Sequence, residues 1–475
     1  MEKKTLDWVL EEYRFPDGPS GPWVFKDRQV DAINGLGLNW NAGHWFEMAV
    51  GKTAISTAIA LYHRIAEGNI TVALMPPILL TQWAKWLRSI KHKDGTPLKV
   101  CLLRGTPKQR AAMDLDADFV VVSYQVFKRE YQRFTDFFKD KKYSIVLDEA
   151  VAVCNVATDT HQMAFDFSLG HPRMLLTGTP MGNVPDAFGL LRFTNPTAYR
   201  SQRMFENMHV DEVDFYGKAK TFKNLETLKE NLDVNSMRVL FREVHKATDP
   251  PLIQKVEYDL SPDHAKLYDR LAENKMLELE SGGKVDGTAV NSLHHMLGQI
   301  VLNWAHFAED PKKVAAGIEL AEEILHELGD GKLVVFVHYR MTVANLLRHF
   351  EDSVSINGDC SPAEKDANLE RFKNDPRCRV IFVQTRSGGF GIDGLQYVCN
   401  NVLWLEPCSL SRDFAQANAR VDRPGQDKRV VVRVAVAAGT NQVSKFDALI
   451  ANDELVGKVV RNMADLRKIV KGGTL

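Results

Sequence analysis

The sequence has few cysteines, no long apolar run and no excess of either charge. Its six cysteines among 475 residues are scattered and form no C-x-x-C pair, so neither a zinc site nor a disulfide framework is predicted. The run "TVALMPPILLTQW" is shorter than the ~18 residues that cross a bilayer, and it contains two prolines. These absences favour a cytoplasmic protein with reduced thiols and no membrane partner.

The charge balance also excludes a simple polycationic coat for nucleic acid. Lys and Arg total 60 and Asp and Glu total 61, which gives a formal net charge of −1. A local basic stripe is still compatible with a nucleic-acid partner, and a solvated surface is the alternative. The candidate basic residues are Lys85, Arg88, Lys91, Lys93, Arg104, Lys108 and Arg110. The N-terminal "MEKKTLDWVLEEYR" lacks an apolar segment, so no signal peptide is expected.

Short apolar runs alternate with amphipathic stretches in both halves of the chain. Runs rich in Val, Ile and Leu that are nearly continuous predict strands buried on both faces of a sheet. Helical stretches between such strands predict two successive α/β domains with parallel sheets. The predicted strands lie in "TVALM", "KVCLL", "DFVVVSY", "YSIVLDEA", "RMLLTGTP", "KLVVFVHY", "SVSING", "CRVIFVQT", "NVLWLEP" and "RVVVRVAVA".

Between the two halves, from about residue 181 to 331, helix formers replace the strand-like runs. We therefore predict three segments: a first lobe over 1–235, a connector with a helical insertion over 236–311, and a second lobe over 312–475.

The stretch "WFEMAVGKTAIS" contains a candidate phosphate-binding loop. Such a loop points backbone N–H groups at phosphates from the N-terminus of a helix, where the dipole favours anions. Ala49, Val50 and Gly51 would form the loop, Lys52 would reach the β- and γ-phosphates, and Thr53 would hold Mg²⁺. A chance Gly-Lys-Thr tripeptide is the alternative.

An acidic pair follows a predicted strand in the same half of the chain. "YSIVLDEA" places Asp148 and Glu149 at the carboxyl end of that strand, where α/β sheets bind ligands. Asp148 is a candidate Mg²⁺ ligand, and Glu149 is the candidate base that activates water. An ordinary acidic strand end is the alternative, which the upstream phosphate loop makes less favourable.

The segment "QANARVDRPGQ" carries two candidate catalytic arginines. Gln416, Arg420 and Arg423 have the spacing i, i+4 and i+7, which predicts one face of a helix. Guanidinium groups on this face are suited to meet the charge of a γ-phosphate, and a solvated helix face is the alternative.

The ordered set of motifs resembles that of superfamily 2 helicases, and most closely the Swi/Snf-type DNA translocases. The series covers residues 25 to about 435, and the pair "SGGFGIDGLQ" and "QANARVDRPGQ" is its most diagnostic part. The motifs are "FKDRQ", "EMAVGKT", "PPILLTQW", "VVSYQ", "DEAV", "LTGTP", "VVFVHY", "QTRSGGFGIDGLQ" and "QANARVDRPGQ". The resemblance implies two RecA-like lobes in tandem that use ATP and Mg²⁺.

The resemblance also implies roles for single residues. Gln29 is expected to read the adenine edge, and Gly391 and Asp393 to lie near the nucleotide. Coupling of the ATP site to the nucleic-acid track is expected from Thr177, Thr179 and Gln416. Residues in motifs that contact the nucleic-acid backbone are Trp83, Ser123, Thr385, Ser387 and Gly388.

The sequence departs from the family pattern at four positions. Phe46 and Ala49 replace glycines of the phosphate loop, Val151 replaces the histidine of a "DEAH" motif, and Asp393 replaces an asparagine. An alanine at position 49 is tolerable where φ is negative and costly where φ is positive.

The leading hypothesis is an ATP-driven motor that moves along duplex DNA and is expected to act as a monomer, with little base specificity and strong salt dependence. An RNA or single-strand helicase of the same fold is one alternative, and a nucleic-acid clamp with a decayed ATPase is another. Because no accessory module is recognisable, we expect a compact prokaryotic or phage protein.

Overall fold

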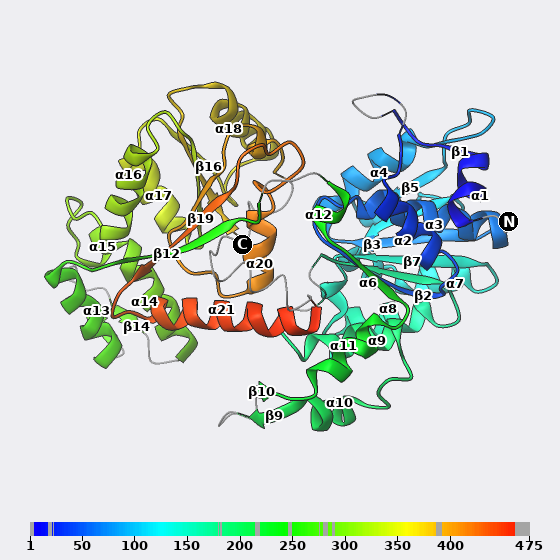
Figure 1. Cartoon of the computed structure of the whole chain (residues 1–475), viewed down its shortest axis with the longest axis horizontal. Coiled ribbons are helices and arrows are strands. Elements are labelled where there is room, and N and C mark those ends of the chain that lie inside the picture. Colours follow the sequence, from blue (N-terminus) through cyan, green and yellow to red (C-terminus); the bar gives the residue numbers. More distant parts are fainter. Residues whose placement is uncertain are drawn as a thin grey trace. The chain divides into compact units, whose positions relative to one another are not determined.

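The computed structural model describes two compact units, which join near residue 246. The described residues are 4–17, 21, 23–178, 180, 183–213, 219–245, 249–274, 276–278, 284–286, 290–385 and 392–460. Figure 1 labels the elements along the chain. Each unit is built around one parallel sheet, as the alternation of apolar runs and helices predicts.

The first unit contains a seven-stranded sheet with the order β11-β2-β8-β7-β3-β6-β5, in which every neighbouring pair is parallel. The strands are β2 (Asn41–Phe46), β3 (Ile70–Met75), β5 (Val100–Leu103), β6 (Phe119–Ser123), β7 (Tyr143–Asp148), β8 (Arg173–Leu176) and β11 (Ser236–Val239). The helices are α1 (Thr5–Glu12), α2 (Asp27–Leu36), α3 (Lys52–Glu67), α4 (Leu80–Ser89), α5 (Pro107–Ala111), α6 (Tyr124–Arg129), α7 (Tyr131–Phe138), α8 (Asp159–Ser168), α9 (Asp186–Thr194), α10 (Gln202–His209), α11 (Leu225–Asp233) and α12 (Phe241–Val244).

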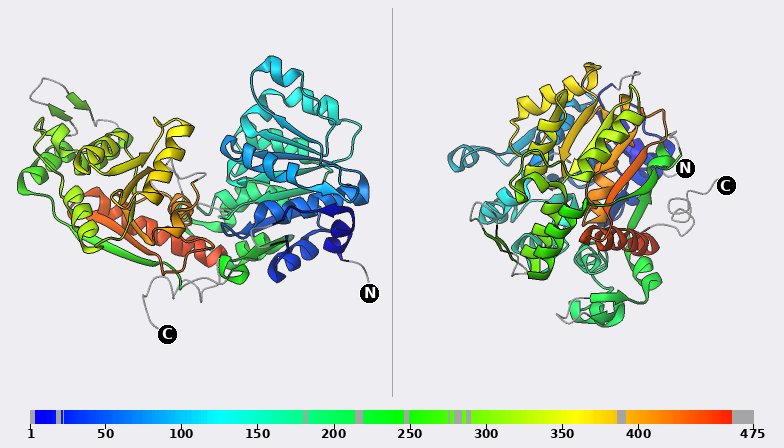
Figure 2. Two further views of the ribbon diagram at one scale, coloured as in Figure 1. Left: turned by 90° about the horizontal axis from the view of Figure 1, so that it is seen from above. Right: turned by 90° about the vertical axis from the view of Figure 1, so that its left-hand side faces the viewer.

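Helices cover both faces of this sheet (Figure 2). On one face, alternate strand residues such as Ala73, Val121 and Val146 join a core with α1 to α4. On the other face, a cluster of edge-to-face aromatic rings packs α6, α7 and α8, with Phe127 and Phe134 among its members. The strands are therefore buried on both sides, which explains their continuous apolar sequences.

The second unit contains a six-stranded parallel sheet with the order β12-β19-β18-β15-β17-β16. The strands are β12 (Leu252–Tyr258), β15 (Leu333–Val337), β16 (Ser353–Ile356), β17 (Val380–Gln384), β18 (Asn401–Trp404) and β19 (Val431–Ala437). The helices are α13 (Pro262–Asn274), α14 (Val290–Leu302), α15 (Trp304–Phe307), α16 (Ala316–Glu327), α17 (Arg340–His349), α18 (Pro362–Asn374), α20 (Ser411–Asn418) and α21 (Asn441–Val460).

Two cores flank the second sheet because side chains alternate between its faces. Val335 belongs to the core that contains α14, α16 and α17, whereas Val334 and Phe336 belong to the core that contains α18, α20 and α21. The described part of the chain has no helix that combines the length and the apolar character needed to cross a bilayer.

All ten strands predicted from apolar runs are present, whereas three other strands of the two parallel sheets were not predicted: β2, β11 and β12. β2 has the sequence "NAGHWF", and its Asn, Gly and His disfavour a strand by propensity. It forms because both neighbours, β8 and β11, supply hydrogen bonds along its length. β11 and β12 are edge strands with shorter or more exposed apolar patterns.

The predicted connector, 236–311, contributes one edge strand to each sheet. β11 pairs with β2 in the first unit, and β12 pairs with β19 in the second unit. Its helices α13 to α15 belong to the second unit. Short two-stranded antiparallel pairs also occur, formed by β1 (Tyr13–Arg14) with β4 (Lys91–His92), β9 (Val210–Val213) with β10 (Ala219–Phe222), and β13 (Met276–Glu278) with β14 (Lys284–Asp286). The three-part division of the sequence stays a prediction.

Candidate nucleotide site and nucleic-acid surface

The carboxyl ends of the central strands of the first sheet bring the predicted motifs together. The register pairs His44 of β2 with Leu176 of β8, and Leu176 with Asp148 of β7. It also pairs Met75 of β3 with Ser123 of β6. Because all these strands are parallel, the residues that follow them lie along one edge, where α/β sheets bind ligands.

The phosphate loop connects β2 to the N-terminus of α3. Gly51 precedes the helix with φ of 95°, and no side chain caps the first turn. The first N–H groups of a helix have no partner within the helix, so this end is suited to bind phosphate oxygens. Gln29 packs against the loop and donates from Nε2 to the Val50 carbonyl at 2.6 Å. A β-carbon at position 51 would lie 2.7 Å from that nitrogen, so glycine is required there.

Both polar ends of Gln29 contact backbone. Its Oε1 accepts a hydrogen bond from the Lys26 amide at 2.9 Å, and its Nε2 contacts Val50. The expected contact of Gln29 with an adenine edge would therefore require it to exchange one of these bonds.

Lys52 folds over its own loop. Its Nζ donates to the carbonyls of Phe46 at 3.0 Å and Glu47 at 3.2 Å. Gly178 approaches the same group, because a β-carbon there would lie 2.7 Å from Met48 Sδ and 3.4 Å from Lys52 Nζ. The sequence pattern assigned roles to Thr177 and Thr179 but missed Gly178. The Thr177 side chain is fully buried, and Thr179 lies outside the described residues.

The acidic pair lies at the end of β7, within electrostatic reach of Lys52. Asp148 is 5% exposed, and burial raises the pKa of its carboxyl. The Trp83 indole N–H and the Lys52 ammonium act in the opposite direction and lower this pKa. Glu149 follows with φ of 50°, a left-handed conformation that is uncommon for this residue type.

The donor set of this edge matches a nucleoside triphosphate and a divalent cation. An uncapped helix N-terminus and an ammonium group suit phosphates, and the Thr53 hydroxyl and the Asp148 carboxylate supply the oxygen ligands that Mg²⁺ prefers.

Trp83 and Ser123 differ from their expected surface roles. Trp83 is 1% exposed, and its Nε1 donates to Asp148 Oδ2 at 2.7 Å. Ser123 is buried and caps α6, accepting from the Val126 amide at 3.2 Å. Each side chain is buried and bonded within the protein, so contact with a polymer would require it to leave that bond. The bond from Trp83 holds the carboxylate of Asp148.

The phosphate loop is also held by the residues that precede the join of the two units. Glu47 Oε2 accepts from the Phe241 amide at 2.9 Å. His245 Nε2 lies 2.9 Å from the Ala49 carbonyl, and its Nδ1 lies 2.8 Å from Lys26 Nζ. The segment that includes α12 therefore fixes the outer rim of the loop.

Ala49 itself has φ of 61°, in the left-handed region. Alanine in place of the family's glycine is therefore unfavourable here, because a β-carbon destabilises this backbone conformation by about 1 kcal/mol.

In the second unit, the prediction that Arg420 and Arg423 lie with Gln416 on one face of a helix is wrong. α20 ends at Asn418, and the Arg420 and Val421 amides donate to Ala417 and Asn418 in successive turns. Arg420 and Arg423 therefore lie beyond the helix, and only Gln416, which is buried, is helical. The Gly-containing "RPGQ" sequence signals this end, because a helix does not continue into a proline.

Arg423 and Asp393 come together, as the diagnostic motif pair implies. Arg423 Nη1 donates to Asp393 Oδ1 at 2.9 Å, and its buried Nε has no hydrogen-bond partner among the described residues. Asp393 is largely exposed, and Gln396 Nε2 also donates to it at 3.3 Å. Gly391, Ser387 and Gly388 lie outside the described residues.

Thr385 belongs to a buried polar cluster that the sequence did not reveal. Its hydroxyl donates to the Val337 carbonyl at 2.8 Å, and its oxygen lies 2.7 Å from His338 Nδ1. The His338 amide donates to Glu406 Oε1 at 3.2 Å. Burial raises the pKa of Glu406, whereas His338 and Lys445 lower it.

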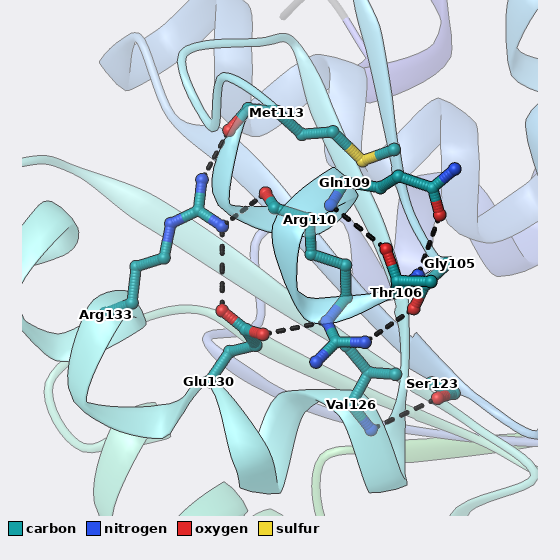
Figure 3. Close-up of polar contacts among 9 residues, drawn as sticks. All are labelled: Gly105, Thr106, Gln109, Arg110, Met113, Ser123, Val126, Glu130 and Arg133. Carbon is teal, nitrogen blue, oxygen red and sulfur yellow. Dashed lines mark hydrogen bonds and ion pairs between the residues drawn. The ribbon is translucent and has the colours of Figure 1, made fainter.

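An exposed basic surface covers part of α4 and the loop that follows β5, and this loop lies at the carboxyl ends of the strands. It contains Lys85, Arg88, Arg104 and Lys108, and none of these four has a carboxylate within ion-pair distance in the described part of the chain. Arg104 follows β5, and its Nη1 lies 3.4 Å from Thr81 Oγ1 at the start of α4. Arg110 was predicted to join this surface, but it is buried against Glu130 because its guanidinium serves an internal ion pair (Figure 3).

A parallel sheet with a phosphate loop, an acidic pair and a second α/β unit defines a nucleoside-triphosphate hydrolase of the helicase-like type. The SNF2-related domain matches residues 6–303, and the helicase conserved C-terminal domain matches residues 316–425. The chain belongs to the SNF2-related family of helicase-like ATPases, which confirms the resemblance to the Swi/Snf-type branch.

Curated relatives include proteins of bacteria and eukaryotes. An uncharacterized ATP-dependent helicase of Mycoplasma pneumoniae is 23% identical over 92% of this chain and 42% of its own length. Protein CHROMATIN REMODELING 4 of Arabidopsis thaliana is 23% identical over 94% of this chain and 22% of its own length. The chain thus spans less than half the length of these relatives. Among solved structures, the SWI2/SNF2 ATPase core of Sulfolobus solfataricus in complex with dsDNA has a TM-score of 0.42 and 21% identity, covering 94% of this chain and 97% of that one.

The left-handed backbone at Ala49 predicts that glycine is favourable there. Ala49→Gly should raise the free energy of unfolding by roughly 0.5 kcal/mol, because relief of strain exceeds the extra chain entropy. Ala66→Gly, at an exposed right-handed position of α3, is the control and should lower it by about 1 kcal/mol. Urea denaturation measures both, and equal destabilisation by the two changes would contradict the conformation at Ala49.

The bond from Trp83 to Asp148 predicts a change in pH dependence. Trp83→Phe removes a donor that favours the ionised carboxylate, so the pKa of Asp148 should rise further. If ionised Asp148 is needed for hydrolysis, the acidic limb of the ATPase pH profile should move to higher pH by about one unit.

Trp86→Phe is the matched control for this change. Trp86 lies on the same helix and donates to Thr57 Oγ1 at 3.2 Å, away from Asp148. Its removal should leave the acidic limb in place. A similar shift in both variants would show that the limb reports general loss of packing rather than the Asp148 carboxyl.

Proposed function

We propose that this chain is an ATP-driven motor that moves along duplex DNA. The observation that carries the proposal is the presence of the phosphate loop, the acidic pair and the exposed cations Arg104 and Lys108 at the carboxyl ends of one parallel sheet. In such an arrangement, one rigid sheet connects the groups that hydrolyse the nucleotide to the groups that grip a phosphate backbone, so each can influence the other. The chain spans less than half the length of its curated relatives. Its activity on a polymer is therefore inferred from its own site residues rather than from those proteins.

In the proposed ATPase, Gln29 meets the base and the loop of Ala49, Val50, Gly51 and Lys52 meets the phosphates. Thr53 and Asp148 hold Mg²⁺, which neutralises phosphate charge when bound. Glu149 orients and deprotonates the attacking water. Burial raises the pKa of Asp148, and the flanking Trp83 N–H and Lys52 ammonium are important because both act against this rise and favour the ionised carboxylate.

In the second unit, Arg420 and Arg423 are proposed to stabilise charge on the γ-phosphate, and Gly391 and Asp393 to lie near the nucleotide. The buried Nε of Arg423 has no hydrogen-bond partner in the described part of the chain, which supports a guanidinium with donor capacity left. Nucleic-acid contacts of Thr385, Ser387 and Gly388, and coupling by Thr177, Thr179 and Gln416, remain part of the same proposal.

The grip is proposed to use backbone phosphates rather than base edges. Lys85, Arg88, Arg104 and Lys108 present flexible or forked cations that form no ion pair with a described carboxylate, which suits phosphate contact. Some curated relatives are named chromatin-remodelling proteins, which favours duplex DNA over the RNA or single-strand alternative. A clamp without ATPase activity is less favourable because the lysine and both acidic residues of the site are present.

The ATPase assignment predicts distinct effects for two substitutions. Lys52→Ala should abolish ATP turnover and weaken nucleotide binding, because it removes the ammonium from the loop. Glu149→Gln should retain binding and lose hydrolysis, since an amide cannot act as the base. Steady-state hydrolysis and binding of a fluorescent nucleotide measure these effects, with Lys93→Ala, an exposed lysine of the same unit, as the control. Turnover by Lys52→Ala equal to that of Lys93→Ala would disprove the site.

The polymer assignment predicts an order of stimulation. Duplex DNA should raise the ATPase rate more than single-stranded DNA or RNA, and stimulation should fall steeply as salt competes for phosphates. Movement along the duplex should displace the third strand of a triplex, with little unwinding of a blunt duplex. Stimulation by RNA alone would instead identify an RNA helicase, and hydrolysis that no polymer changes would exclude a motor.

A further inference from the structure

The loop after β5 presents two cations of the basic surface on an ordered backbone. We call residues 104–113 the basic loop. Arg104 and Lys108 are exposed, and Gly105 between them has φ of 98°. This positive φ favours glycine in the turn, and a β-carbon at Gly105 would also lie 2.6 Å from Gln109 Oε1. Thr106 and Gln109 form a capping box at the start of α5. Local sequence thus shapes the loop, but it does not attach the loop to the sheet.

Arg110 attaches the loop from beneath. Its side chain is 6% exposed, and its Nε donates to Glu130 Oε1 at 2.7 Å. Its Nη1 donates to the Gly105 carbonyl at 2.6 Å. The guanidinium therefore connects the turn at Gly105 to the junction of α6 and α7, where Glu130 lies (Figure 3).

Arg133 of α7 holds the far end of the same loop. Its Nη1 donates to the Arg110 carbonyl at 2.8 Å, and its Nη2 donates to the Met113 carbonyl. Its Nη1 also lies 3.6 Å from Glu130 Oε2. One carboxylate thus lies between two guanidinium groups, and these two groups contact three carbonyls of the basic loop.

Glu130 is the group on which this arrangement depends. Its side chain is 14% exposed, so the dielectric screening is reduced and an unpaired neighbour would be costly. Without the negative charge, Arg110 and Arg133 would repel each other and Arg110 would be a buried cation with no counter-charge. The favourable outcome for such a cation is to move toward solvent, which would release the Gly105 carbonyl and displace Arg104 and Lys108.

We propose that Glu130, with Arg110 and Arg133, sets the position of the basic loop so that Arg104 and Lys108 engage successive phosphates of a nucleic-acid backbone. Glu130 is a positioning residue for polymer binding, and it touches neither nucleotide nor polymer. This inference rests on the proposed function, because the loop is taken to face the polymer. It differs from an ordinary stabilising ion pair in one consequence: loss of Glu130 weakens polymer engagement while the nucleotide site is unchanged.

The decisive variant is Glu130→Gln, which retains shape and removes charge. The concentration of duplex DNA that gives half-maximal ATPase stimulation should rise about tenfold, whereas the maximal rate, the basal rate and the KM for ATP stay within about twofold. The dependence of log affinity on log salt should become shallower by about one to two phosphate contacts, which matches loss of Arg104 and Lys108. Glu130→Asp, which keeps the charge, should recover part of the affinity.

Asp118→Asn is the matched control. Asp118 is a buried carboxylate of the same unit that pairs with Arg64. It immediately precedes β6 and so lies at the amino ends of the strands, whereas the basic loop lies at their carboxyl ends. Asp118→Asn should lower the melting temperature about as much as Glu130→Gln does. It should not change the duplex concentration that gives half-maximal stimulation, nor the dependence of log affinity on log salt. Equal shifts of half-maximal stimulation in the two variants would overturn the proposal.

Amide hydrogen exchange of the free protein separates this inference from the proposed function. Glu130→Gln should speed exchange at Arg110 and Met113, whose amides donate to Thr106 and Arg110 within the loop, and Asp118→Asn should not. Unchanged amide exchange in Glu130→Gln would overturn the positioning role, whether or not a polymer stimulates the ATPase. Faster exchange in a protein that no polymer stimulates would overturn the proposed function instead. Should Glu130→Gln fail to fold, Arg133→Met, which leaves the Arg110–Glu130 pair intact, should show the same exchange and affinity changes to a smaller extent.

Discussion

The parallel register of β2, β8 and β7 is the constraint on which the candidate nucleotide site depends. It aligns His44, Leu176 and Asp148 across three neighbouring strands, so the residues that follow each strand meet at one edge. Lys52 then lies close enough to lower the pKa of Asp148, and Gly178 lies against the loop that carries Lys52. A shift of one residue in any of the three strands would reverse its side chains and separate these groups.

Strained and buried polar groups concentrate at this edge. Ala49 and Glu149 are two of the few residues other than glycine with positive φ among those described, and both flank the phosphate-binding elements. Asp148 is buried at an electrostatic cost, which the Trp83 N–H and the Lys52 ammonium offset in part. Such features persist only where surrounding contacts over-determine them, and here the supporting contacts come from Gln29, His245 and α4.

The arginines of the first unit illustrate how burial divides one residue type into two roles. Arg104 is exposed and has no carboxylate partner among the described residues, which suits contact with an external anion. Arg110, only six positions along the chain, is buried against Glu130 and contacts backbone carbonyls of the same loop. The first can exchange water for phosphate at little cost, whereas the second cannot leave its carboxylate without a large desolvation penalty.

Much of the architecture follows from the sequence alone. Continuous Val-, Ile- and Leu-rich runs identify ten strands, "DEA" after one of these runs identifies the acidic pair, and "GKT" before a helical stretch identifies the loop, since strand patterns and helix-start chemistry are local properties. Strand β2 escaped prediction because its hydrogen bonds come from β8 and β11, which are more than a hundred residues away in the chain. The positive φ of Ala49, the end of α20 before Arg420, the burial of Trp83 and the separation of Arg104 from Arg110 were decided by tertiary contacts. Those properties depend on which distant groups share a hydrogen bond or exclude water, and no local pattern of residues records that.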